Sequence, residues 1–112
     1  MDGINVSTGK RLAGIAHLRQ SIRDILTTPK GARVMRRDYG SDLPRLVDAP
    51  MNAQTFMKIY AATHEAIKRW EPRFLLEQTR IVTAAPGRIE LDLIGMYMPN
   101  GEPVTLDGIE IK

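Results

Sequence analysis

An acid–proline–base triplet, Glu71-Pro72-Arg73, follows the chain's only tryptophan, Trp70, and sets two opposite charges two residues apart. Proline disfavours helical geometry in the residue before it, so a helix is expected to end near Trp70. In an extended chain, residues i and i+2 lie on the same face. Glu71 and Arg73 could therefore form an ion pair or a two-pronged contact with a partner. The alternative is that Pro72 only ends a helix and both charges are solvated.

Outside this triplet, the sequence contains few residue patterns that suggest catalysis. The sequence has no Gly-rich phosphate loop, no zinc-protease motif and no nucleophile elbow. It also has no cysteine, which excludes disulfides and thiolate metal sites. His64 falls near an apolar helical stripe. A histidine there is more simply interpreted as a core or boundary residue than as a metal ligand. Glycoside hydrolysis needs only two suitably separated carboxylates, and among 13 acidic residues some pair always qualifies. We therefore predict no enzyme activity, no metal and no cofactor.

The net charge of +3 hides an asymmetry between the two ends of the chain. Acidic residues outnumber basic ones over residues 74–112, whereas residues 1–37 are strongly basic. A helix, a turn and a second helix in the basic part loosely imitate a helix-turn-helix, but the second helix is very short. A solvated face or an acidic protein partner is favoured over nucleic acid. The basic residues are Lys10, Arg11, Arg19, Arg23, Lys30, Arg33, Arg36 and Arg37.

The length of 112 residues predicts a single domain with a modest core. No apolar run approaches the roughly 20 residues that span a bilayer. The first residues lack the pattern of a signal peptide. These features predict a protein made in the cytoplasm with no membrane partner.

The first half of the chain predicts helices. Residues 1–14 are polar, show no sustained period, and predict a flexible N-terminal arm. A helical stripe starts at Ile15 and runs to Leu26. Pro29 is expected to open a short second helix over residues 29–35. Thr28 would be its N-cap, and Val34 and Met35 would be buried.

A long amphipathic helix is expected over residues 53–70. Asn52 is a good N-cap for it, and Ser41 or Asp42 could cap a shorter turn before it. The predicted apolar stripe consists of Phe56, Tyr60, Thr63 or His64, Ile67 and Trp70, widened by Met57, Ala61 and Ala62.

The period changes to two after Pro72, which predicts strands over residues 73–83, 88–98 and 104–111. Pro86-Gly87 and Asn100-Gly101 supply the two turns. The predicted fold class is α+β: N-terminal helices followed by a three-stranded antiparallel β-meander.

The second predicted strand carries apolar residues on both faces in its distal half, because Ile94, Met96 and Met98 continue the face of Glu90 and Asp92. Something is expected to cover this part: either the N-terminal arm or another molecule. The sheet also has at least one free edge, where another chain could add a strand.

Three runs of residues, in order and in register, resemble the W-protein (GPW) family of baseplate wedge proteins from contractile phage tails, and its P2-like members in particular. Residues 22–35 resemble the family's I-x-x-L-L-x-T-x-x-G-x-R signature. Asp38-Tyr39-Gly40-Ser41 is similar to its aromatic-glycine loop, and Glu71-Pro72-Arg73 to its characteristic triplet. The same family includes the lysozyme-like subunit of the type VI secretion baseplate.

The resemblance implies one baseplate wedge domain over residues 15–112, with six copies per baseplate in the virion tail, assembled in the host cytoplasm. It implies docking through the triplet onto core-bundle wedge subunits, and a sheet similar to the strand-exchange domain of sheath proteins, which would start sheath assembly by strand addition. A lysozyme-like enzyme and a basic nucleic-acid-binding protein are the alternatives. The residues expected to bind partners are Glu71, Pro72, Arg73, Arg36, Arg37, Tyr39, Ile94, Met96 and Met98.

Overall fold

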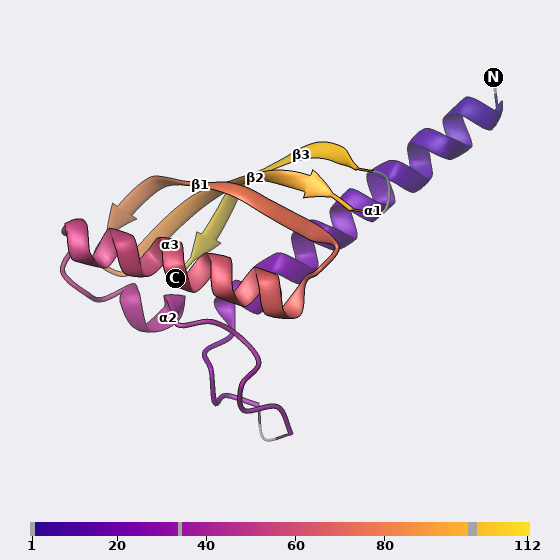
Figure 1. Cartoon of the computed structure of the whole chain (residues 1–112). Helices are drawn as coiled ribbons and strands as arrows, with labels where there is room; N and C mark the ends of the chain where they lie inside the picture. The colour runs from indigo at the N-terminus through magenta and orange to yellow at the C-terminus, as the bar shows by residue number, and fades with distance from the viewer. Residues whose placement is uncertain (1, 34, 99–100) are drawn as a thin grey trace.

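The computed structural model describes residues 2–33, 35–98 and 101–112, with side chains described from Ala13 onward. It confirms the α+β fold class, with the helices first and one antiparallel sheet after them (Figure 1). The elements are α1 (Asp2–Thr27), α2 (Leu43–Leu46), α3 (Ala53–Trp70), β1 (Phe74–Ala85), β2 (Arg88–Tyr97) and β3 (Glu102–Ile111).

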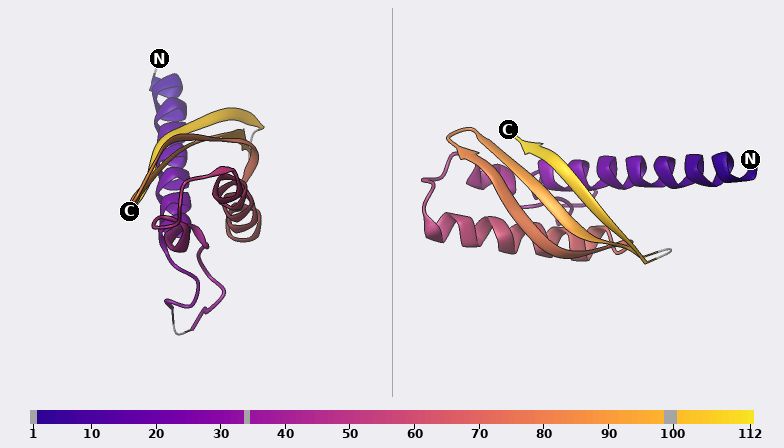
Figure 2. Two further views of the ribbon diagram at one scale, coloured as in Figure 1. Left: turned by 90° about the vertical axis from the view of Figure 1, so that its left-hand side faces the viewer. Right: turned by 90° about the horizontal axis from the view of Figure 1, so that it is seen from above.

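Helix α1 begins at Asp2, so the predicted helix start at Ile15 and the loose conformation of residues 1–14 are wrong for the described part. Figure 2 shows that the first half of this helix extends beyond the sheet. The first half of α1 does not pack on the rest of the protein and has no core to face. This explains why its sequence lacks an apolar stripe. The division into an arm over residues 1–14 and a domain over residues 15–112 stays a prediction.

The predicted helix over residues 29–35 is wrong, because none of its described residues is helical. Thr28 does not cap a new helix; its hydroxyl donates to the carbonyl oxygen of Asp24, at the end of α1. Met35, predicted to be buried, is 93% exposed, and Val34 lies outside the described residues.

The chain between α1 and α2 is instead an irregular loop whose ends lie side by side. Pro29 pairs with Ser41 in an isolated parallel bridge, and the Ser41 N–H donates to the Thr28 carbonyl oxygen at 2.9 Å. Gly40 makes this approach possible: its φ is +112°, and a Cβ on it would lie 2.2 Å from the same oxygen. The buried Ser41 hydroxyl then accepts from the Leu43 N–H at the start of α2.

The bounds of α3 confirm the predicted helix and its cap, since the Asn52 carboxamide accepts from the Thr55 N–H at 3.0 Å. The predicted apolar stripe is confirmed at Ala62, Thr63 and Ile67, which are buried, and Phe56 and Trp70 pack partly buried against the core. It is wrong at Met57 and Tyr60, which are 71% and 42% exposed, and Ala61 and His64 are exposed as well. The small residues of the buried face let the helix lie close to its neighbours. The buried residues are Thr55, Ile59, Ala62, Thr63, Ala66 and Ile67.

The three strands form a meander in the order β1-β2-β3, as predicted. The turn between β1 and β2 is confirmed, with Gly87 at φ +82° after Pro86. The turn residues 99–100 lie outside the described part. Both strand pairings contain register shifts, two between β1 and β2 and one between β2 and β3.

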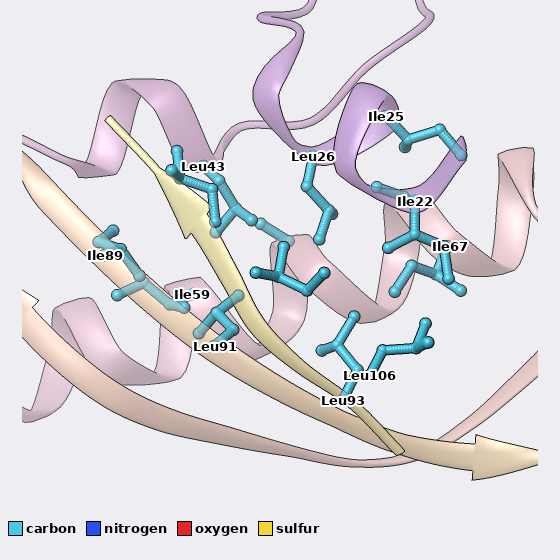
Figure 3. Packing of buried hydrophobic residues seen from close by; sticks show 14 of the residues in the cluster. Ile22, Ile25, Leu26, Leu43, Ile59, Ile67, Ile89, Leu91, Leu93 and Leu106 are labelled. Carbon is cyan, nitrogen blue, oxygen red and sulfur yellow. The ribbon is translucent and has the colours of Figure 1, made fainter. Parts of the chain in front are cut away.

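The core lies between the helices and one face of the sheet (Figure 3). Alternation along β2 sends Ile89, Leu91 and Leu93 to this face, and all three are fully buried. They meet Leu18, Ile22, Ile25 and Leu26 of α1, Ile59 and Ile67 of α3, and Leu106, Ile109 and Ile111 of β3.

Candidate partner-binding surfaces

The acid–proline–base triplet lies between the end of α3 and the start of β1, and its two charges form an internal ion pair. The Glu71 carboxylate is only 3% exposed. It accepts from Arg73 Nε at 2.8 Å and from Arg73 Nη2 at 3.1 Å, while the Ser21 hydroxyl of α1 donates to it at 2.6 Å. The predicted i, i+2 pairing is therefore present in the structure.

Backbone hydrogen bonds fix this triplet from both sides. The Glu71 N–H donates to the Ile67 carbonyl oxygen at 2.8 Å and closes the last turn of α3. The Met98 N–H donates to the Arg73 carbonyl oxygen at 2.7 Å and begins the pairing with β2. The triplet is thus held by backbone hydrogen bonds between the end of α3 and the start of the sheet.

The electrostatics of the pair keep Glu71 ionised. Burial by itself raises the pKa of Glu71, but hydrogen bonds from Arg73 and Ser21 outweigh it and leave that pKa below its ordinary value. The hydrogen bond to Glu71 raises the pKa of Arg73. Glu71 is occupied inside the molecule, whereas Pro72 is exposed and the Arg73 side chain is 49% exposed.

Tyr39 belongs to a second group, in which the loop after α1 packs against the two long helices. Its ring meets the Trp70 ring edge-on, with centroids 5.2 Å apart, and the Arg33 guanidinium lies 4.4 Å from its centroid. Its hydroxyl donates to the Asp24 carboxylate. Burial, together with this hydrogen bond, raises the pKa of Tyr39 to about 12.

Two further arginines flank the tryptophan. The guanidinium groups of Arg36 and Arg69 lie 5.7 and 5.2 Å from the Trp70 ring centroid, within the range of cation–π attraction. Arg69 also pairs with Asp38. The members of this cluster come from α1, the loop and α3, so no local spacing in the sequence could reveal it.

Arg37, the remaining predicted basic contact, is exposed in the same loop, and its carbonyl oxygen accepts from the Gly31 N–H at 2.7 Å. The structure therefore brings Arg36 and Tyr39 together around Trp70, with Arg37 next to them in the chain. It does not bring them to the triplet's ion pair.

The apolar residues of the second strand lie on the sheet face opposite the core. Met96 pairs with Leu75 of β1 and Pro103 of β3, and Leu75 is 53% exposed. Ile94 and Met96 are partly buried, and Met98 is 50% exposed. Of the two covers that the sequence left open, the N-terminal arm is ruled out, because the first half of α1 extends away from the sheet (Figure 2).

Several charges of the basic N-terminal part are matched by acids that the fold brings to them. Arg19 Nη2 lies 2.8 Å from Asp107 of β3, and Lys30 Nζ lies 3.0 Å from Glu65 of α3. The hydrogen bond from Arg19 lowers the pKa of Asp107, and the one to Glu65 raises the pKa of Lys30. Internal ion pairs therefore neutralise part of the positive charge of the N-terminal residues.

In the described part of the chain, the His, Asp and Glu side chains form no group of three that could hold a metal ion. None of the described helices is long and apolar enough to cross a membrane.

Comparison with known proteins gives one consistent family. A model of the family described as baseplate wedge protein gp25 matches residues 13–98. Baseplate protein W of Escherichia phage P2 is 39% identical over 104 residues, which cover 93% of this chain and 90% of that protein.

Two solved structures share the fold. The crystal structure of a protein described as a tail lysozyme from Geobacter sulfurreducens matches with a TM-score of 0.72 at 32% identity, covering 83% of this chain and 86% of that one. A chain of the post-contracted baseplate of pyocin R2 matches with a TM-score of 0.63 at 45% identity, covering 73% and 83% of the two chains.

Proposed function

The chain belongs to the baseplate wedge protein gp25 family, and from this premise we propose that it docks onto other wedge subunits without performing catalysis. It is a structural subunit of a contractile tail baseplate, where it associates with other baseplate proteins. The proposal adds specific partners: the core-bundle wedge subunits and the tail sheath protein, with six copies of this chain per baseplate.

The docking proposal rests on the fixed and half-exposed Arg73 side chain of the triplet. The Glu71 carboxylate, which accepts from the Ser21 hydroxyl, holds the Arg73 guanidinium, and about half of that side chain is exposed next to the exposed Pro72. A preorganised arginine loses little conformational entropy on binding and can still donate to a partner's carboxylate. Glu71 acts as a positioning residue for Arg73 rather than as a contact itself.

The test is capture of the other wedge proteins by the tagged full-length chain. Arg73→Lys keeps a positive charge beside Glu71 but loses the planar two-donor head, so capture should weaken by about fivefold or more. Arg80→Lys, an exposed arginine of β1, is the matched control and should bind like the wild type. Unchanged capture by Arg73→Lys, with matching thermal unfolding curves, would remove the triplet from the docking surface.

The exposed loop with Arg36 and Arg37 and the outer sheet face with Ile94, Met96 and Met98 are proposed as further contact surfaces. Exposed apolar side chains grouped on one sheet face favour a protein partner, and the open sheet offers edges for strand addition by the sheath protein.

The same geometry argues against a lysozyme mechanism. A glycosidase needs a carboxylic acid that stays protonated near neutral pH, through a raised pKa. Glu71 is the buried carboxylate of the described residues, and its ion pair with Arg73 lowers its pKa instead. We expect no release of reducing sugars when the purified protein is incubated with peptidoglycan. Release that disappears on a single carboxylate substitution would overturn this expectation.

A nucleic-acid role is not favoured, because basic side chains that would contact phosphates are engaged internally. Arg33 pairs with Asp24, and Arg36 lies over Trp70. We expect no measurable DNA binding at low salt, where electrostatic binding is strongest.

A further inference from the structure

We propose that the loop between α1 and α2 binds an acidic segment of another baseplate protein, through Arg36, which lies over Trp70, and its neighbour Arg37. This inference rests on the proposed function, because it takes the loop as a contact surface for a baseplate partner and names the chemistry of that partner. Figures 1 and 2 show that the loop extends from the body on the side away from the sheet.

The loop carries positive charge that the fold does not neutralise. Its other basic side chains, Lys30 and Arg33, form ion pairs with acids of α3 and α1. Asp38, the acid that follows the two arginines in the chain, is paired with an arginine of α3. Arg36 and Arg37 are both exposed, and within the described part of the chain no acidic side chain forms an ion pair with either of them. Two adjacent arginines are therefore available to a partner's acids.

Backbone hydrogen bonds fix both arginines within the loop. The Arg36 N–H donates to the Arg33 carbonyl oxygen at 3.3 Å, and the Arg36 carbonyl oxygen accepts from the Tyr39 N–H at 3.1 Å. The Arg37 carbonyl oxygen accepts from the Gly31 N–H at 2.7 Å. A loop whose backbone is already fixed loses less conformational entropy on binding than a flexible loop. The two arginines are thus presented from a preorganised backbone.

The tryptophan orients the first of these arginines. The Arg36 guanidinium lies 5.7 Å from the Trp70 ring centroid, and Tyr39 packs edge-on against the same ring. A cation–π contact uses the face of the guanidinium, whereas the N–H donors lie in its plane and point outward from its edges. These donors match the two oxygens of a carboxylate. Arg36 can therefore keep its contact with the ring while it binds a partner's acid.

An acidic protein segment fits this surface better than a nucleic acid. Nucleic acids carry regularly spaced phosphates, and their binding depends on many cationic contacts. In this loop the two arginines are followed by Asp38 and Asp42, whose side chains are 54% and 42% exposed. A continuous run of phosphates would meet these carboxylates, whereas a protein segment can place its acids at the arginines alone. The occupant is thus a protein segment with closely spaced carboxylates.

Binding can be followed through Trp70, the chain's single tryptophan, because a carboxylate that reaches Arg36 changes the surroundings of its ring. The probe is a short peptide of alternating glutamate and glycine, and its control has glutamine in place of glutamate. A thymidine oligonucleotide of equal charge tests nucleic acid. We expect the acidic peptide to change the fluorescence of the full-length chain, with an affinity that falls as salt is added, and the glutamine peptide to have no effect.

Two double variants of equal net charge locate the site. Arg36→Gln with Arg37→Gln should weaken binding of the acidic peptide by about tenfold or more, because both charge-assisted pairs are lost. Arg45→Gln with Arg80→Gln removes the same charge from exposed positions on α2 and β1, and should weaken binding by less than about twofold. Equal weakening in the two variants, no peptide binding by the wild type, or tighter binding of the oligonucleotide than of the peptide would overturn the assignment.

Capture of the baseplate proteins encoded with the same tail gives a second test, with thermal unfolding curves as the check on folding. The variant at Arg36 and Arg37 should weaken capture by about threefold to tenfold, and the variant at Arg45 and Arg80 should behave like the wild type. Wild-type capture by the first variant, while Arg73→Lys still weakens it, would overturn the acidic-segment assignment and leave docking through the triplet standing. No capture by the wild type would instead overturn the proposed function, and this inference with it.

Discussion

At the scale of single residues, Glu71 links three parts of the molecule. Its carboxylate is buried and ionised, and it receives hydrogen bonds from Ser21 of α1 and from Arg73 at the start of β1. A buried charge of this kind is tolerated because its acceptor positions are filled. Its structural role is to hold the helices, the sheet and an exposed arginine in one arrangement.

Glu71→Gln should lower the free energy of unfolding by about 2 kcal/mol, less than the full cost of breaking a buried pair because Arg73 can turn to solvent. Urea unfolding at pH 7 measures the change. Glu77→Gln, an exposed acid of β1, is the control and should stay within about 0.5 kcal/mol of the wild type. Equal stabilities of the two variants would contradict the structural role of Glu71.

The lowered pKa of Glu71 makes this stabilisation depend on pH. Because the pKa of Glu71 in the folded state lies below its ordinary value of 4.5, the contribution is complete above pH 4.5 and is lost as the pH falls through the folded-state pKa. The stability difference between the wild type and Glu71→Gln should therefore shrink as the pH is lowered below 4.5. A difference that stays constant or grows on acidification would contradict the assignment.

At the scale of elements, the loop between α1 and α2 shows how an irregular segment is fixed. Gly40 brings its two ends together at Thr28, and Tyr39 packs against Trp70 beside Arg33. This loop presents Arg36 and Arg37, so its conformation determines the geometry of a proposed contact surface.

Gly40→Ala should destabilise the protein by about 3 kcal/mol or more, because the new Cβ combines a strained positive φ with a collision with the Thr28 carbonyl oxygen. Gly31→Ala is the matched control. Gly31 also has a positive φ, but nothing lies within 4 Å of its Cβ position, so the cost should be only about 1 kcal/mol. Thermal unfolding compares the two, and similar losses would contradict the close contact at Gly40.

The elements also show what sequence reasoning can reach. The strands and both ends of α3 were predictable, because alternation, the Asn52 cap and Pro72 are local signals. The buried face of α3 was predictable only in part: Ala62, Thr63 and Ile67 belong to the predicted stripe, whereas Thr55, Ile59 and Ala66 lie outside it and are buried by the closeness of neighbouring elements. The internal role of Glu71 was also out of reach, because its partner Ser21 is 50 residues away.

At the scale of the whole molecule, the fold is a compact body from which one helix extends. The helices cover one face of the sheet, and the other face keeps Leu75 and Met98 about half exposed (Figures 1 and 2). Both the protruding half of α1 and this open face fit a subunit that is completed by its neighbours in an assembly. Regular alternation along β2 made the open face predictable, whereas the length of α1 was not.

The most direct test of a structural role is electron microscopy of tails made by a strain that lacks this chain, with and without complementation. We predict that tails with an assembled baseplate and extended sheath are lost without the chain and return with the wild type. Arg73→Lys should restore them poorly, and Arg80→Lys fully. Complete sheathed tails in the absence of the chain would contradict its role as a baseplate subunit.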